Sequence, residues 1–260
     1  MSKLPKAAGT VPISEWKNEA EKLNALTFGE KTEEIDCPKC NNRGIVYFMQ
    51  GDEVVSKKCE CWKVRQSLAR IRRSGLQSLI KTYTFDRYLT EQPFQKFIKQ
   101  KALDFVQSKP KCFFIGGQVG CGKSHICTAI VGELLRQGLE ARYMQWRDDV
   151  TSIKSNANTS DYSRLLTPFK TVPVLYIDDL FKTEAGKLPT TADVNIAFEI
   201  INHRYINPDY ITVISTEKTM DELIAIDEAV ASRICEMAGK YMTSIGRDRA
   251  KNYRLKGVVS

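Results

Sequence analysis

The sequence predicts an α/β fold in which a parallel β-sheet lies between helices, preceded by a small zinc-binding module. Short apolar runs of the buried-strand type alternate with helical or polar segments from residue 112 onwards. A glycine-rich loop joins the first of these runs to a helix, and four cysteines stand in two close pairs between residues 37 and 61. Strands that alternate with helices favour a parallel sheet, and 260 residues are enough for one such domain with a small appendage.

The loop "GGQVGCGKSH" at residues 116–125 matches the spacing G-x-x-x-x-G-K-[ST] of a phosphate-binding loop. A predicted strand at 112–115 precedes it, and apolar residues recur at helical spacing from 126 to 135 until Gly138 ends the helix. A turn alone would explain the glycines but not the lysine. Because backbone amides and a helix N-terminus attract phosphate, this stretch predicts an ATP site. Its candidate residues are Gly117, Gly120, Gly122, Lys123, Ser124 and His125.

Two aspartates follow an apolar run in "VLYIDDL". Further strands are predicted at 141–145, 172–177 and 211–216, and parallel strands end at one edge of a sheet, beside the phosphate loop. Asp178 is therefore expected to hold Mg²⁺ beside Ser124, and Asp179 to polarise the attacking water. The alternative is a turn that merely follows a strand.

The paired cysteines are spaced as metal ligands. Cys37 and Cys40 form "CPKC", and Cys59 and Cys61 form "CEC". The stretch between the pairs is predicted to form two strands around a turn at Gly51 and Asp52, which would bring four thiolates together as a structural zinc site. The alternative is a set of free thiols.

The chain is predicted to divide into an N-terminal module, residues 1–81, and a core, residues 82–260. The module would hold an amphipathic helix within 1–35, the zinc hairpin at 37–61 and a basic helix broken near Gly75; residues 81–93 would be a linker into a helix at 94–107. Residues 37–81 carry 10 Lys/Arg against 3 Asp/Glu, and residues 240–256 carry 6 against 1, within a formal charge of +8. Such segments fit contact with a polyanion, or else solvated helix faces.

No stretch has the apolar length of a membrane-spanning helix, and the first residues lack the apolar run of a signal peptide. The expectation is a cytoplasmic protein with no membrane contact.

Together, these motifs resemble those of bacterial and phage replicative helicase loaders of the DnaC/DnaI type, which are AAA+ ATPases. The resemblance rests on "GGQVGCGKS", "VLYIDDL", "TVIST", "EAVASRICEM" and "KNYRL". It implies an AAA+ core that binds and slowly hydrolyses ATP, stimulated by single-stranded DNA and by self-association into a hexamer or open spiral. It also implies an N-terminal module that binds a hexameric replicative DNA helicase.

The resemblance assigns further roles residue by residue. The end of "TVIST" makes Thr216, with Ser215 beside it, the sensor of the γ-phosphate, although asparagine is usual there. Arg233 aligns with the arginine finger that completes a neighbouring subunit's site, with Arg204 as a competitor, and Arg254 aligns with the second sensor. Asp179 stands where glutamate is commoner.

Between residues 146 and 170 the resemblance implies an extra helix that follows single-stranded DNA. Cations interleaved with aromatic rings suit sequence-tolerant binding. The predicted contacts are Arg147, Lys154, Tyr162, Arg164, Phe169 and Lys170. Two alternatives to a loader remain open: the ATPase partner of a transposase, and a nucleic-acid adaptor in which ATP only locks a conformation.

Overall fold

The computed structural model describes residues 19–29, 35–73, 76–184 and 186–255. The chain forms two compact units, one ending at Arg65 and the other beginning at Gln66. The predicted boundary was at residue 81; the structural boundary comes earlier because the chain from Gln66 onwards belongs with the core. A Cβ atom on Gly132 would lie 3.7 Å from Ile80 Cγ2, so the helix that holds Ile80 packs on the helix that follows the phosphate loop.

The first unit consists of a short helix, α1 (Glu19–Leu26), and a two-stranded antiparallel sheet of β1 (Ile45–Gln50) and β2 (Glu53–Lys58). Gln50 pairs with Glu53, so Gly51 and Asp52 form the two-residue turn that the sequence predicts. Asn24 holds α1 to β1 by exchanging hydrogen bonds with the backbone of Tyr47. The residues predicted to lie on the amphipathic helix before position 19 fall outside the described residues.

Helix α2 (Cys61–Arg73) contains the boundary between the units, and α3 (Leu76–Thr82) follows it. The helix break predicted near Gly75 falls at residues 74–75, which are outside the described part. Helix α4 (Pro93–Ser108) matches the predicted helix at 94–107.

The second unit contains a five-stranded parallel sheet with the order β4-β5-β6-β3-β7. The strands are β3 (Cys112–Gly117), β4 (Ala141–Gln145), β5 (Val174–Asp178), β6 (Ile211–Ser215) and β7 (Met242–Ile245). Strands β3 and β6 are buried along their whole length, and four of the five residues of β5 are buried. These runs are apolar because both faces of the sheet are covered. The predicted α/β fold is confirmed; β7 was not predicted.

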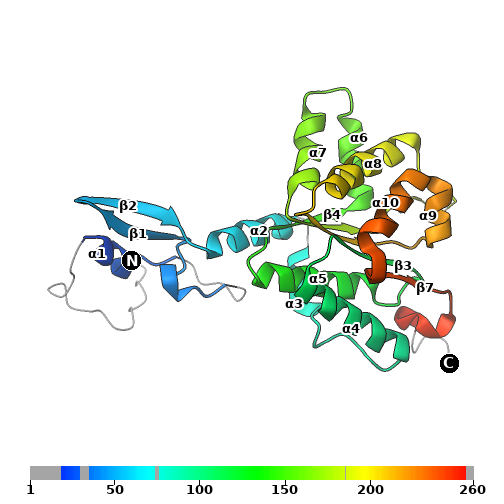
Figure 1. The fold of residues 1–260 in the computed structure, drawn as a ribbon, viewed down its shortest axis with the longest axis horizontal. Coiled ribbons are helices and arrows are strands. Elements are labelled where there is room, and N and C mark those ends of the chain that lie inside the picture. Colours follow the sequence, from blue (N-terminus) through cyan, green and yellow to red (C-terminus); the bar gives the residue numbers. More distant parts are fainter. Residues whose placement is uncertain (1–18, 30–34, 74–75, 185, 256–260) are drawn as a thin grey trace, which may run out of the picture. The chain divides into compact units, whose positions relative to one another are not determined.

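Helices cover both faces of this sheet (Figure 1). On one side lie α3, α4 and α5 (Lys123–Arg136). On the other lie α6 (Trp146–Ser155), α7 (Asp161–Thr171), α8 (Thr191–Ile206), α9 (Met220–Ile226) and α10 (Glu228–Ala238). From β3 the chain crosses to β4 at one edge, whereas β7 joins β3 on its other side. Open parallel sheets bind ligands where the strand order reverses in this way, at the carboxyl ends of the strands. Within the described residues, no helix is long and apolar enough to span a membrane.

Candidate nucleotide site

The phosphate loop leaves β3 at Gly117 and enters α5 at Lys123. Gly117 has φ +101°, and a Cβ atom there would lie only 2.2 Å from the carbonyl oxygen of Ile245. Gln118 N–H donates to that same oxygen at 3.1 Å. Strand β7 therefore fixes the start of the loop, and only glycine fits at this point.

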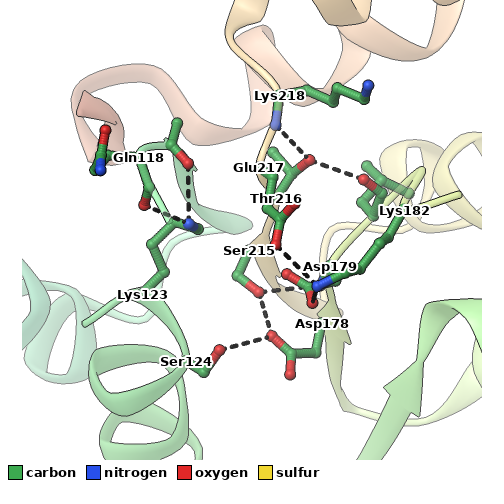
Figure 2. A network of polar contacts seen from close by, with 12 residues as sticks. Gln118, Lys123, Ser124, Asp178, Asp179, Lys182, Ser215, Thr216, Glu217 and Lys218 are labelled. Carbon is green, nitrogen blue, oxygen red and sulfur yellow. Dashed lines mark hydrogen bonds and ion pairs between the residues drawn. The ribbon is translucent and has the colours of Figure 1, made fainter. Parts of the chain in front are cut away.

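Lys123 is buried, with 6% of its surface exposed. Its ammonium group donates to the carbonyl oxygens of Gly117 at 2.9 Å and Gln118 at 2.7 Å, as Figure 2 shows. An ammonium group has three protons, so one donor remains for a ligand in the loop. The lysine thus has the position that the motif requires.

Asp178, the last residue of β5, accepts hydrogen bonds from four hydroxyl groups. Ser124 donates to Oδ1 at 3.2 Å, Tyr176 donates to Oδ1 at 2.7 Å, and Tyr143 donates to Oδ2 at 2.9 Å. Ser215, at the end of β6, donates to Oδ1 as well (Figure 2). The structure therefore brings Ser124 and Asp178 together at the edge of the sheet, as the sequence predicts.

Asp179 lies one residue further on, with a left-handed φ of +58°. Its Oδ2 atom is 2.7 Å from Lys182 Nζ, and the same ammonium lies 2.8 Å from Glu217 Oε1 (Figure 2). Burial raises the pKa of the Asp179 carboxyl, and the Lys182 hydrogen bond opposes that rise. Sequence reasoning did not identify Lys182 or Glu217, since neither lies in a recognised motif.

Thr216 is fully buried beyond the end of β6. Its hydroxyl donates to Leu180 O at 2.8 Å and accepts from Lys218 N–H at 3.1 Å. The single hydroxyl proton is therefore used within the protein, and contact with a phosphate would require Thr216 to leave Leu180. The sensor role of Thr216 stays a prediction.

A cavity of about 220 Å³ lies against the phosphate loop. Lys123, Ser124, Asp179 and Arg254 line it, so the structure brings these predicted site residues to one place. Arg254 arrives with the C-terminal segment, in which Tyr253 N–H donates to Gly120 O at 2.9 Å. The predicted second sensor is thus beside the phosphate loop.

Aromatic rings also line this cavity; His125 was predicted there, whereas Tyr83 and Tyr88 were missed because residues 81–93 were interpreted as a linker. Tyr83 stacks on His125 with ring centroids 4.6 Å apart, and Tyr88 meets the same ring edge-on. His125 Nε2 lies 2.9 Å from Thr84 O, and burial lowers the pKa of the His125 imidazole. The Tyr88 hydroxyl is buried and has no hydrogen-bond partner within the described residues. A wall of aromatic rings that also offers a hydroxyl group without a partner suits a nucleobase.

Arg233 and Arg204 differ in accessibility. Arg233, on α10, is partly exposed and donates to Asn202 Oδ1 at 2.9 Å. Arg204 is fully buried and donates to five backbone carbonyl oxygens between residues 169 and 211 and to Thr212 Oγ1. Burial lowers the pKa of Arg204 to about 9. Because every arm of its guanidinium group is bound inside its own subunit, Arg204 stabilises the fold, and Arg233 is the better finger candidate.

The four predicted cysteine ligands converge in the first unit. The sulfur atoms of Cys37, Cys40, Cys59 and Cys61 all lie within 4.8 Å of one another. Cys37 Sγ is 3.8 Å from Cys59 Sγ, and Cys40 Sγ is 3.5 Å from Cys61 Sγ. A tetrahedral zinc site with Zn–S bonds of about 2.3 Å places its sulfur atoms about 3.8 Å apart. The donor set and its spacing therefore fit Zn²⁺.

The predicted DNA contacts lie on α6 and α7, but all four cations have acidic partners. The pairs are Arg147 with Glu184, Lys154 with Asp193, Arg164 with Asp161 and Lys170 with Glu199. Tyr162 donates its hydroxyl to Glu199 at 2.7 Å. The prediction that Phe169 stacks on a base is wrong. The residue is 3% exposed and the Arg142 guanidinium lies 4.6 Å from the centre of its ring, so the ring has no free face for a base.

The comparisons place the chain in a known family. The family model of the IstB-like ATP binding protein matches residues 39–237. YqaM, an uncharacterised protein of Bacillus subtilis, is 29% identical over 87% of this chain and 88% of its own length. XkdC, from the phage-like element PBSX of the same organism, is 30% identical over 86% of this chain and 87% of its own length.

The replicative helicase loader DnaC of Escherichia coli is 30% identical over 42% of this chain and 46% of that protein. A crystal structure of the DnaC helicase loader matches the fold with a TM-score of 0.54 and 20% identity, covering 65% of this chain and 98% of that one. These matches confirm the resemblance to DnaC-type AAA+ proteins that the motifs indicate. The chain belongs to the IstB-like ATP-binding protein family.

Proposed function

We propose that this chain is an ATP-driven loader of a hexameric replicative DNA helicase. The observation that carries the proposal is the presence of two features in one chain: the constellation of Lys123, Ser124, Asp178 and Asp179 around the phosphate loop, and the four-cysteine hairpin module. The first supplies a site for ATP. The second supplies a separate compact unit for holding a partner.

In the proposed reaction, water attacks the γ-phosphorus of ATP and yields ADP and phosphate. Lys123 contacts the phosphate oxygens, and Mg²⁺, when bound, neutralises charge between the phosphates. The Ser124 hydroxyl and the Asp178 carboxylate are hard oxygen donors of the kind that Mg²⁺ prefers. Asp179 orients the water and accepts its proton. The ring surface of Tyr83, Tyr88 and His125 holds the adenine.

Two arginines complete this site. Arg254 approaches the γ-phosphate within the same chain, and Arg233 reaches the site of a neighbouring copy. A guanidinium group suits both roles because its planar set of donors meets phosphoryl oxygens in two places and stays charged. Hydrolysis then depends on self-association, which single-stranded DNA promotes.

The N-terminal module predicted at residues 1–81, with its zinc hairpin at 37–61, is proposed to hold the helicase, and α6 and α7 are proposed to contact single-stranded DNA. The cations on these helices would exchange their acidic partners for phosphates, so binding would weaken strongly with salt.

The test is a loading assay with the full chain, the hexameric helicase of the same cell or phage, and circular single-stranded DNA. We expect helicase to appear on the circles only with ATP, and to be lost with Cys37→Ser/Cys40→Ser. Cys235→Ser is the matched control, because Cys235 lies outside the cluster. Capture of a transposase instead of the helicase, or ATP binding with no effect on loading, would overturn the loader in favour of the transposase partner or the adaptor.

A further inference from the structure

The turn after β5 has an unusual backbone for its residues. Asp179 and Phe181 both have left-handed φ angles, +58° and +59°, although neither is glycine. Such angles persist only where the surroundings hold them, and they concentrate at functional sites. Phe181 is fully buried and packs edge-on against Trp146, and this contact anchors the turn.

Ser215 and Thr216, at the end of β6, also hold this turn through hydrogen bonds. Leu180 N–H donates to Ser215 O at 2.9 Å, and Thr216 Oγ1 donates to Leu180 O at 2.8 Å. Asp179 N–H donates to Ser215 Oγ at 3.2 Å. The backbone of Asp179 is therefore fixed by β6, and its side chain needs a separate support.

Lys182 provides that support. Its ammonium group lies between Asp179 Oδ2 at 2.7 Å and Glu217 Oε1 at 2.8 Å (Figure 2). All three side chains line the cavity at the phosphate loop. Each is more than a quarter exposed, and ion pairs this accessible contribute little to stability. Placement of the carboxylate explains the contact better than stability does.

We propose that Lys182, anchored by Glu217, is a positioning residue that aims the Asp179 carboxylate at the attacking water. This inference rests on the proposed ATPase function. Sharing one ammonium between two carboxylates leaves a net negative charge, so Asp179 is oriented without being fully neutralised. Misplacing a reacting group by about 1 Å can cost on the order of 10²-fold in rate.

The test compares single-turnover ATP hydrolysis and nucleotide affinity in the full chain with single-stranded DNA. We expect Lys182→Met to lower the hydrolysis rate about 10–100-fold, with nucleotide affinity changed less than about threefold. Lys182→Arg should recover part of the rate, and Glu217→Gln should lose less than Lys182→Met. Lys187→Ala, an exposed lysine paired with Glu184, is the matched control and should hydrolyse ATP normally.

Further variants separate the possible failures. In an Asp179→Asn background, Lys182→Met should cause no further loss, because both changes act on one group. An inactive Asp179→Asn beside a fully active or faster Lys182→Met would overturn this inference alone. Wild-type turnover in Asp179→Asn would overturn the proposed base, and this inference with it.

Discussion

Ser124 Oγ donates a hydrogen bond to Asp178 Oδ1 at 3.2 Å, joining the start of α5 to the end of β5 across 54 positions of the chain. Three other hydroxyl groups hold the same carboxylate. With its orientation fixed in this way, the carboxylate forms with the Ser124 hydroxyl the pair of oxygen atoms proposed to hold Mg²⁺.

Asp178→Asn should therefore reduce activation by Mg²⁺ more than it reduces the stability of the fold. The amide keeps an oxygen that can accept hydrogen bonds but loses the charge that attracts the cation. Titrating hydrolysis with Mg²⁺ should show half-activation at least about tenfold higher, since a lost charge-assisted contact costs on the order of 1.5–3 kcal/mol. An unchanged midpoint would mean that the metal ligand lies elsewhere.

Lys123→Ala and Asp179→Asn should differ in what they lose. In the proposed reaction the lysine contacts phosphate in both ground and transition states, so its removal should abolish nucleotide binding or hydrolysis. Asp179 is proposed to act on the water, so its amide variant should bind ATP normally and hydrolyse it about 10²–10⁴-fold more slowly. Equilibrium binding and single-turnover rates, measured on the same preparations, separate the two.

Arg233→Ala should lower hydrolysis about 10³-fold or more under conditions of self-association, as expected for an arginine finger. Mixing this variant with Lys123→Ala should restore part of the activity, because hybrid interfaces join an intact phosphate loop to an intact finger. Arg204→Ala is unsuitable as a control, since its loss would remove a hydrogen-bond donor from five buried carbonyl groups and disturb the fold. If no mixing ratio restored activity while both variants remained folded, Arg233 would act within its own subunit.

The purified chain should contain one zinc ion, bound by the four cysteines. Removing it should unfold the hairpin unit, which has little core of its own, and leave the α/β unit folded. Metal analysis under reducing conditions and hydrogen exchange before and after chelation measure this. Cys112 and Cys127 are fully buried in the core of the α/β unit, so amide hydrogen exchange around them should be the same before and after chelation.

Lys154→Ala and Arg164→Ala should each weaken binding to single-stranded DNA without affecting helicase binding. If each cation contacts one phosphate, the slope of log affinity against log salt should fall by about 0.7 per variant. Arg136→Ala is the matched control for Arg164, since both are exposed arginines paired with an acid three residues earlier. Deleting residues 1–61 should do the reverse, abolishing helicase binding and sparing DNA binding. The opposite pattern would reverse these assignments.

The phosphate loop and the order of strands and helices were predictable because they depend on local patterns. The apolar runs before Gly117 and Asp178 identify strands, and the motif spacing identifies the loop. The cysteine spacing was equally informative, because the two-residue turn at Gly51 brings the pairs together. The structure confirms the strands before the loop and before Asp178, and it brings the four cysteine sulfur atoms together.

Other parts depend on contacts that no local pattern reveals. Strand β7 is the four-residue stretch "MTSI", too short and too polar to stand out, and it becomes a strand by pairing with β3. Phe169 has the composition expected of a base-stacking residue, but it packs into the core under Arg142. Lys182 lies at the site because the turn before it has left-handed φ angles at Asp179 and Phe181, and such angles are rare for residues other than glycine.

The last described segment also constrains which residues the loop can carry. A Cβ atom on Gly120 would lie 2.0 Å from Asn252 Oδ1, and Tyr253 N–H is bonded to the carbonyl of the same glycine. A side chain at position 120 would therefore require the Asn252 side chain to move, in addition to adopting the left-handed φ of +73° that favours glycine there. A truncation before residue 252 would remove the first obstacle and leave the second. Part of the tolerance to substitution in the loop is in this way determined by a residue far along the chain.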